Sequence, residues 1–212
     1  MTAKPVFCRI PNRGLITLSG HDSMSFLQGL ISNDIYLLDQ QTSIYSCLLT
    51  PNGKFLFDFF IYKNEENICI ECEGGERAEA LLKRLNMFKL RADVSFDIIQ
   101  EHAVFAILHG TPTNCSTYPD TRHDKLGMRT AQKPEDLEEL SFKEWDKHRI
   151  KLGVPDGSRD MIAEKSTLLE CNIDQLNGVS FKKGCFMGQE LTARMHYRSL
   201  TKKTLIPVEF DE

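Results

Sequence analysis

The sequence predicts an α+β fold made mainly of antiparallel sheet with a few packed helices. Strand-like runs follow one another with hairpin-type turns between them, and helical periodicity is confined to a few short stretches. The glycine patterns GxGxxG and GxxxxGK[ST], which open the phosphate-binding loops of nucleotide-binding α/β proteins, are absent. With 212 residues, 41% hydrophobic and 26% charged, the chain has the composition of a globular protein with a core of ordinary size.

The strongest local signal is a hairpin in the first third of the chain. The apolar runs SIYSCLLT (43–50) and FLFDFFIYK (55–63) flank PNGK. Asn-Gly between two such runs predicts a two-residue turn, because both positions tolerate positive φ. A strand at 15–19 and a short helix capped by Asp22 or Ser23 precede the hairpin, and ICIECE follows it as a further strand.

Two longer helices are predicted from apolar residues at helical spacing. Strands are expected at 94–99 and 103–110, whereas 111–140 is polar, contains three prolines and predicts mostly loop with one short strand. The helix-forming positions are Ala78, Leu81, Leu82, Leu85 and Phe88 in the first helix, and Phe142, Trp145, Arg149 and Leu152 in the second, which Gly153 and Pro155 end.

We divide the chain into three regions on this pattern. Residues 1–100 are the first part of the sheet-plus-helix unit, 101–155 a smaller α+β segment with the polar loop, and 156–212 a return segment. No internal repeat or low-complexity segment is visible.

The cysteines and the N-terminus indicate a reducing compartment. Seven scattered cysteines are typical of reduced thiols rather than a disulfide framework. The N-terminal stretch has neither a signal peptide nor an amphipathic presequence, and no apolar run is long enough to span a membrane. We expect the cytoplasm, or the mitochondrial matrix for a processed eukaryotic form. Cys69 and Cys72 form a CxxC, but a strand there places the two sulfurs on opposite faces, so strand packing is favoured over a metal site.

Positive charge gathers near the C-terminal end although the formal net charge is −4. Residues 182–203 include six Lys/Arg and one acidic residue, which gives this segment a formal charge of +5, whereas the rest of the chain has a formal charge of −9. This pattern indicates an anionic ligand bound locally rather than a nucleic acid bound over the whole surface. The alternative is a solvated helix face.

Asp58 interrupts a strand that is otherwise apolar on both faces. A carboxylate there must be paired, hydrogen-bonded or facing a polar cavity, since unpaired burial is costly. Two interpretations stay open: a structural ion pair with an arginine, or an acid that meets a cationic or N–H-rich ligand.

The stretch VSFKKGCFMGQE (179–190) places Cys185 in a second candidate site. If Gly188 opens a helix, the cysteine lies just before its positive end and beside Lys182 and Lys183, which would stabilise a thiolate. The two glycines permit close backbone approach. The alternative is a buried, inert cysteine, since free cysteine is often a core residue.

The same stretch resembles a known family. KGCFMGQE is similar to the KGCYxGQE signature of the YgfZ-type folate-binding proteins, relatives of the glycine-cleavage T-protein, an aminomethyltransferase. GHDSMSFLQGLISNDI, LLTPNGKFLFDF, FKLRADV and RIKLGVPDGSRDM are similar to further segments of that family, the last pointing to its iron–sulfur cluster assembly branch in mitochondria and related bacteria. The resemblance covers nearly the whole chain.

The resemblance implies a T-protein-like fold around a central cavity that holds tetrahydrofolate, and a role in assembling or repairing iron–sulfur clusters. Cys185 then matches the signature cysteine, and Asp58 falls where the T-protein has its catalytic carboxylate. The implied folate-binding positions are Asp58, Lys183, Gly184, Gly188, Gln189, Glu190 and Arg194, with no metal site. Phe186 replaces the usual tyrosine, and the family's C-terminal β-barrel is not expected in this sequence.

Three functions follow from these patterns. The favoured one is a tetrahydrofolate-binding accessory protein with Cys185 as its key thiol, partnered by iron–sulfur client or assembly proteins and not by a membrane. The second is a folate-dependent aminomethyltransferase in which Asp58 orients the folate. The third is an RNA-binding module of residues 182–203, which is disfavoured because no aromatic stacking platform accompanies the charge.

Overall fold

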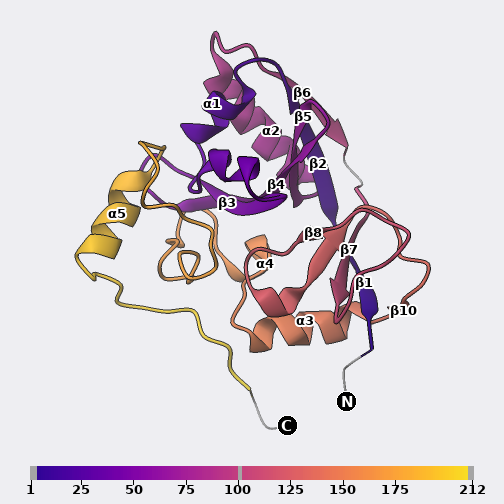
Figure 1. Ribbon diagram of the computed structural model, residues 1–212. Coiled ribbons are helices and arrows are strands. Elements are labelled where there is room, and N and C mark those ends of the chain that lie inside the picture. The colour runs from indigo at the N-terminus through magenta and orange to yellow at the C-terminus, as the bar shows by residue number, and fades with distance from the viewer. Residues whose placement is uncertain (1–3, 100–101, 210–212) are drawn as a thin grey trace.

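The computed structural model describes residues 4–99 and 102–209 and shows two five-stranded sheets with helices on their outer faces (Figure 1). The first sheet has the order β3-β4-β5-β2-β6 and the second the order β10-β1-β7-β9-β8. All pairings are antiparallel except that of β1 with β10. The α+β class is therefore confirmed.

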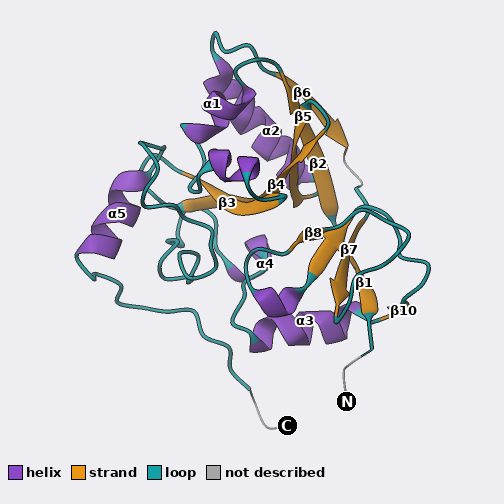
Figure 2. Cartoon of the chain, in the orientation of Figure 1, coloured by secondary structure: helices purple, strands orange, loops and turns teal. Residues whose placement is uncertain are grey.

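The first sheet carries the hairpin and is covered by two helices (Figure 2). Its order requires β2 to lie between β5 and β6, with Ile16 opposite both Ile70 and Ile98. The elements of this unit are β2 (Arg13–Ser19), α1 (Ser23–Gln28), the 3-10 helix η1 (Ile35–Asp39), β3 (Ser43–Leu49), β4 (Phe55–Asn64), β5 (Asn67–Glu73), α2 (Glu76–Lys89) and β6 (Ser95–Ile99).

The second sheet is smaller and packs on α3 through Trp145. Its first strand comes from the N-terminus, so residues 1–100 supply one strand to the sheet that residues 104–139 otherwise form. The elements are β1 (Val6–Ile10), β7 (Val104–Leu108), β8 (Tyr118–Pro119), the 3-10 helix η2 (Asp124–Leu126), β9 (Met128–Thr130), β10 (Glu138–Glu139) and α3 (Phe142–Lys151), followed by α4 (Gly157–Asp160) and α5 (Gln189–Tyr197).

The hairpin strands β3 and β4 are buried on both faces, as their sequences predict. One face packs against α1 and α2, through residues such as Leu48, Phe59 and Ile61. The other face, with Tyr45 and Phe60, packs against the return segment that ends in α5. Because both faces of these strands are buried, their sequences are almost wholly apolar and do not alternate between apolar and polar residues.

Two local predictions are wrong. The hairpin turn is not a two-residue turn: the loop runs from 50 to 54, and within it only Gly53 has a positive φ. The polar stretch 111–140 contains three short strands rather than one: β9 pairs with β7 and carries the buried Arg129, and β8 and β10 form the two edges of the second sheet.

Buried charges join the two sheets. Glu71 of β5 accepts hydrogen bonds from Arg13 of β2 and from Arg129 of β9, and Arg129 also donates to Asp120 at 3.2 Å. Asp120 in turn pairs with Arg122 at 2.7 Å. Burial alone would raise the pKa of Glu71, but the charges of Arg129 and Arg13 outweigh it and hold that pKa well below its ordinary value. Glu71 is therefore ionised, and its negative charge is compensated by Arg13 from the first sheet and Arg129 from the second.

No helix in the described ranges combines the length and the apolar character needed to cross a bilayer.

Replacing Glu71 tests the role of these charges. Glu71→Gln leaves Arg13 and Arg129 without their compensating carboxylate, so the free energy of unfolding at pH 7 should fall by about 3–5 kcal/mol. Because the folded-state pKa of Glu71 is depressed, its contribution is present above the ordinary pKa of 4.5 and is lost as the pH falls below it. Denaturant unfolding at several pH values should show a smaller loss of stability on acidification in the variant than in the wild type. Glu138→Gln, at an exposed pair with Lys4, is the control; equal effects of the two substitutions would contradict the prediction.

Candidate functional site

The signature cysteine lies on an exposed loop between the return segment and α5. All seven cysteines fall in the described part of the chain; Cys185 is exposed, Cys115 is half-buried and the other five are buried. The predicted helix is present and begins after Gly188, three residues beyond the thiol. The interpretation of Cys185 as an inert core residue is therefore wrong.

Lys183 fastens this loop to the first sheet unit. Its ammonium group donates three hydrogen bonds, to the carbonyl oxygens of Gln28 (2.7 Å), Ile31 (2.8 Å) and Asn33 (2.8 Å). The Gln28 carbonyl belongs to the last residue of α1, whose final acceptors lack partners within the helix, and the Ile31 and Asn33 carbonyls belong to the turn that follows. Burial lowers the pKa of Lys183 to about 8, and Asp34 opposes that shift.

The three hydrogen bonds of Lys183 give this side chain a structural role in the fold. All three donors of the ammonium group are used within the fold, so this side chain positions the loop; its predicted role toward folate stays a prediction. The neighbouring Lys182 is exposed and lines a cleft described below.

Gly188 is required by close packing. It has φ +79°, and a Cβ there would lie 2.4 Å from the Thr50 carbonyl oxygen and 3.1 Å from the Cα of Gly53. Gly53 is equally crowded, since its Cβ would meet Leu191 and the Gly188 carbonyl. The hairpin loop and the start of α5 thus approach through two facing glycines. Gly184, by contrast, has open space around it.

The remaining signature residues divide between the fold and the surface. The Gln189 side chain accepts a hydrogen bond from the backbone N–H of Phe186 at 3.3 Å, and Phe186 packs in the core. Glu190 and Arg194 are exposed on α5. Internal contacts of Phe186 and Gln189 therefore help to fix the loop conformation, whereas Glu190 and Arg194 are free to meet other molecules on the surface of α5.

Asp58 is enclosed. It is 8% exposed, and its Oδ2 accepts a hydrogen bond from the Tyr45 hydroxyl at 2.9 Å. A Cβ on Gly157 would lie 3.0 Å from its Oδ1, so only glycine lets the backbone of α4 cover the carboxylate. Burial raises the pKa of Asp58, and the nearby charges of Arg13 and Arg122 oppose that shift. The hydrogen-bond partner of Asp58 inside the fold is thus a tyrosine, which the sequence did not indicate.

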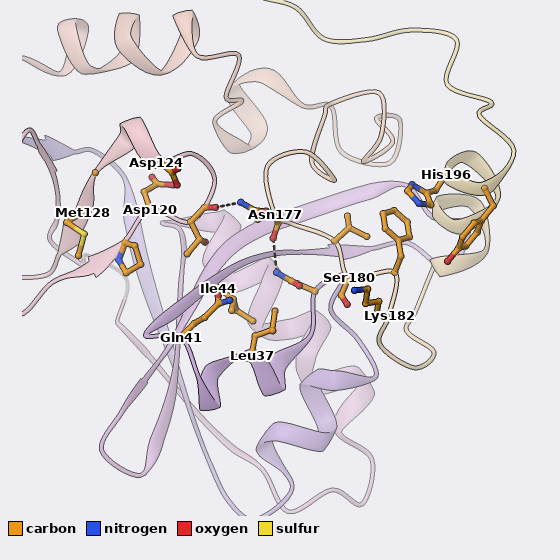
Figure 3. Close-up of a pocket in the computed structure, with 17 residues that line it drawn as sticks. Leu37, Gln41, Ile44, Asp120, Asp124, Met128, Asn177, Ser180, Lys182 and His196 are labelled. Carbon is orange, nitrogen blue, oxygen red and sulfur yellow. Dashed lines mark hydrogen bonds between the residues drawn. The ribbon is translucent and has the colours of Figure 1, made fainter.

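A cleft of about 920 Å³ lies between the two sheet units and the return segment. Figure 3 shows Asp120 and Asp124 at one end and Lys182 and His196 at the other, with Asn177 between them. Apolar side chains lie along it, and the ring of Phe181 stacks on His196 with centroids 3.7 Å apart. Asp58 and Cys185 are not among the lining residues.

Hydrogen bonds tie the walls of this cleft together. The Asn33 side chain donates to the carbonyl of Asn177 at 2.8 Å, and the Asn177 side chain donates to the carbonyl of Thr121 at 2.9 Å, as the dashed lines in Figure 3 show. The Ser43 hydroxyl donates to the Pro119 carbonyl at 2.9 Å. Three segments distant in sequence are thereby held in one arrangement.

Sequence analysis did not single out most of these cleft residues. Asn33 and Asn177 both lie in segments that resemble the family, but their roles in the cleft depend on contacts between distant parts of the chain. Glu71 could have been found by the argument applied to Asp58, since it too is an acid inside an apolar strand.

No group of three or more His, Cys, Asp or Glu within residues 4–99 and 102–209 is arranged to hold a metal ion. Cys69 and Cys72 both lie in β5, and only Cys72 joins the first core cluster.

The fold and the comparisons define the class of the protein. No family model matches the chain. The structure is similar to that of the glycine cleavage system aminomethyltransferase T from Bartonella henselae, with a TM-score of 0.71 and 14% identity over 92% of this chain and 64% of that one. The chain therefore has the aminomethyltransferase fold.

The sequence relatives are more specific. The chain is 31% identical to the human mitochondrial iron-sulfur cluster assembly factor IBA57, over 95% of this chain and 65% of that protein. It is 32% identical to the Coccidioides immitis homolog and 29% identical to the Mycosarcoma maydis homolog, in each case over 95% of this chain and 56% of the relative. The chain is thus a homologue of the IBA57 iron–sulfur cluster assembly factors and spans between about half and two thirds of their length. The resemblance found in the sequence is confirmed.

Thiol labelling tests the exposure of Cys185. Iodoacetamide added to the native protein should modify Cys185 first, because the other thiols are half-buried or buried. Mass spectrometry of the peptides over time measures this order. The Cys185→Ser variant should lose the fast phase and Cys115→Ser should keep it; a fast phase that survives Cys185→Ser would contradict the exposure seen here.

Substituting Lys183 tests the loop attachment. Lys183→Met leaves three carbonyl oxygens without their donor, which should lower the free energy of unfolding by about 2–3 kcal/mol. It should also speed amide hydrogen exchange across residues 180–188, because the loop loses its anchor. Lys182→Met, next to it but exposed, is the matched control. Equal protection of the loop in both variants would show that the ammonium group does not hold it.

Proposed function

We propose that the chain is a tetrahydrofolate-binding accessory protein in the assembly or repair of iron–sulfur clusters, with Cys185 as its key thiol. The observation that carries the proposal is the exposure of Cys185 on a loop that the fold holds in place. The names of its IBA57 homologues support the cellular role.

The exposed position of Cys185 allows its thiol to react with or bind another molecule. Thiolate sulfur is a soft ligand that iron–sulfur clusters select, and it is also the reactive form in thiol exchange. The cluster is here the cargo, and because the described residues hold no ready set of ligands around Cys185, the other ligands come from the partner. Iron–sulfur client or assembly proteins are therefore the partners that we propose.

The dimensions and lining of the cleft support the folate part of the proposal. The cleft volume of about 920 Å³ lies in the range of about 300–1,000 Å³ that is typical of small-molecule sites. Its apolar walls suit an aromatic ring system, and Lys182 suits the carboxylates of a glutamate tail. Bound tetrahydrofolate would supply a reduced pterin able to carry a one-carbon unit.

The aminomethyltransferase alternative loses its support in this structure. A carboxylate that orients a substrate must reach it, whereas Asp58 is enclosed by Tyr45 and the backbone at Gly157. An RNA-binding role for 182–203 is weakened as well, because Lys183 is committed to the fold.

We place the protein in a reducing compartment, the cytoplasm or the mitochondrial matrix. The curated relatives are named as mitochondrial, and an exposed thiol needs a reducing environment to stay free.

Complementation tests the proposed function. In a strain that lacks its own family member, the wild-type chain should restore the activity of four-iron enzymes, and Cys185→Ala should not. Cys115→Ala, which removes a thiol elsewhere on the molecule, should restore activity like the wild type. Immunoblotting confirms equal amounts of each variant. Full rescue by Cys185→Ala would reject the assigned role of the thiol.

A further inference from the structure

The last turn of α2 and the turn that leads to β6 expose two large apolar side chains. This part of the chain, residues 83–91, projects from the first sheet unit on the side away from α3 (Figure 1), and we call it the basic tip. Met87 is 60% exposed and Leu90 is 89% exposed, the highest value among the large apolar residues of the described ranges. The buried face of α2 is formed by Ala78, Leu81 and Leu85, so the exposed pair adds nothing to the core.

The backbone of Leu90 is strained. Leu90 ends α2 with φ 46° and ψ −107°, a conformation that is costly for a residue with a side chain. Helices that end on a positive φ usually have glycine or asparagine there. A leucine at this position carries backbone strain without gaining burial, and strain of this kind is often found where a side chain has a function.

The turn that presents Leu90 is fixed to the start of α1. The backbone N–H of Asp93 donates to the Asp22 carboxylate at 2.8 Å, and the backbone N–H of Asp22 donates to the Asp93 carbonyl at 3.1 Å. The Asp93 carboxylate accepts a hydrogen bond from the backbone of His21 at 3.4 Å. A Cβ on Gly20 would clash with the Asp93 carbonyl. The two carboxylates beside the basic tip therefore hold the turn in place.

The basic tip concentrates positive charge. It contains four Lys/Arg and no acidic residue, a formal charge of +4 in a chain whose net charge is −4. Lys83 and Arg91 are exposed, and Arg84 and Lys89 are half-buried. None of the four belongs to a salt bridge between described residues. Cations at the end of a helix complement its negative pole, but this does not explain the apolar side chains among them.

The composition of the basic tip favours a lipid surface over a protein partner. Sites that dominate protein–protein binding are enriched in aromatic anchors, whereas leucine is under-represented, and the exposed apolar residues here are a leucine and a methionine. Exposed apolar side chains beside Lys and Arg are typical of segments that lie in the interface of anionic membranes. Each Lys or Arg close to such a surface adds to the attraction.

We infer that the basic tip docks the protein on the surface of an anionic phospholipid bilayer. Leu90 and Met87 enter the headgroup layer, and the four cations meet the negative charges of the lipids. The contact is peripheral and needs no membrane-spanning helix. It differs from the expectation that no membrane is a partner, because the exposure of Leu90 depends on the folded position of the turn. It does not depend on the proposed function, since the tip contains neither Cys185 nor any residue that lines the cleft.

Vesicle co-sedimentation of the full chain tests this inference. At low ionic strength the wild type should bind phosphatidylcholine vesicles that contain about one third phosphatidylserine, should not bind phosphatidylcholine alone, and should dissociate as salt is added. Leu90→Gly should weaken binding by about 5- to 10-fold because it removes the most exposed apolar side chain. Its melting temperature should be no lower than that of the wild type, since glycine adopts positive φ without strain.

A second variant and two controls separate the tip from the rest of the surface. Lys83→Gln combined with Arg91→Gln should weaken binding by about 10- to 30-fold; both positions are exposed, so this variant decides if Leu90→Gly does not fold. Ile206→Gly removes an equally large apolar side chain that is 65% exposed elsewhere, and Lys203→Gln removes an exposed charge outside the tip. Both controls should bind like the wild type.

Three outcomes would overturn the inference. The first is a wild type that does not distinguish anionic from neutral vesicles. The second is vesicle binding that the tip variants leave unchanged, which would assign it to another surface such as the basic segment 182–203. The third is a wild type that ignores vesicles while folded Leu90→Gly fails in complementation, which would assign the tip to a protein partner. None of these results changes the test of Cys185.

Discussion

Three hydrogen bonds from one ammonium group determine how this protein presents its thiol. Lys183 joins residues that are about 150 positions apart, the signature loop and the segment at the end of α1. It donates to the last carbonyl of that helix and to two carbonyls of the turn that follows. The facing glycines Gly53 and Gly188 bring the hairpin loop against α5 on the other side of the same loop. Cys185 lies between these two attachments and remains exposed because neither of them covers it.

Buried polar groups are also paired between the two sheets. Arginines and carboxylates that would be costly in isolation compensate one another across β2, β5 and β9, and Tyr118 adds a hydroxyl to Glu71. Breaking a buried set of this kind exposes unpaired charge, so the relative position of the sheets is strongly specified. The cleft is a consequence of that position, since one wall comes from each sheet unit and the third from the return segment. The thiol and the cleft are therefore separate features that depend on one arrangement.

The sequence predicted what depends on local patterns. Apolar alternation identified β3, β4 and β5, and helical spacing identified α2 and α3, where Ser141 and Glu144 form a capping box. The helix after Gly188 and the close approach of that glycine were also predictable, because both follow from residue type and spacing. The resemblance of KGCFMGQE to a family signature also agrees with the similarity of the chain to iron–sulfur cluster assembly factors.

What the sequence could not supply were the partners of long side chains. The same KKGC run is compatible with two free lysines or with one buried and one exposed, and only the position of α1 decides that Lys183 points inward. The short strands β8 and β9 have weak patterns of their own and exist because a neighbouring sheet edge pairs with them. Asp58 was correctly identified as an unusual acid, but its enclosure depends on Gly157, a residue that lies about 100 positions further along the chain.

The most direct test of this account is to observe the ammonium group of Lys183 by NMR spectroscopy. At neutral pH and low temperature, couplings across the hydrogen bonds should link its nitrogen to the carbonyl carbons of Gln28, Ile31 and Asn33, and its protons should exchange slowly with water. A Lys183 ammonium group that rotates freely, exchanges as fast as that of Lys182 and shows none of these couplings would contradict the central claim that it holds the signature loop.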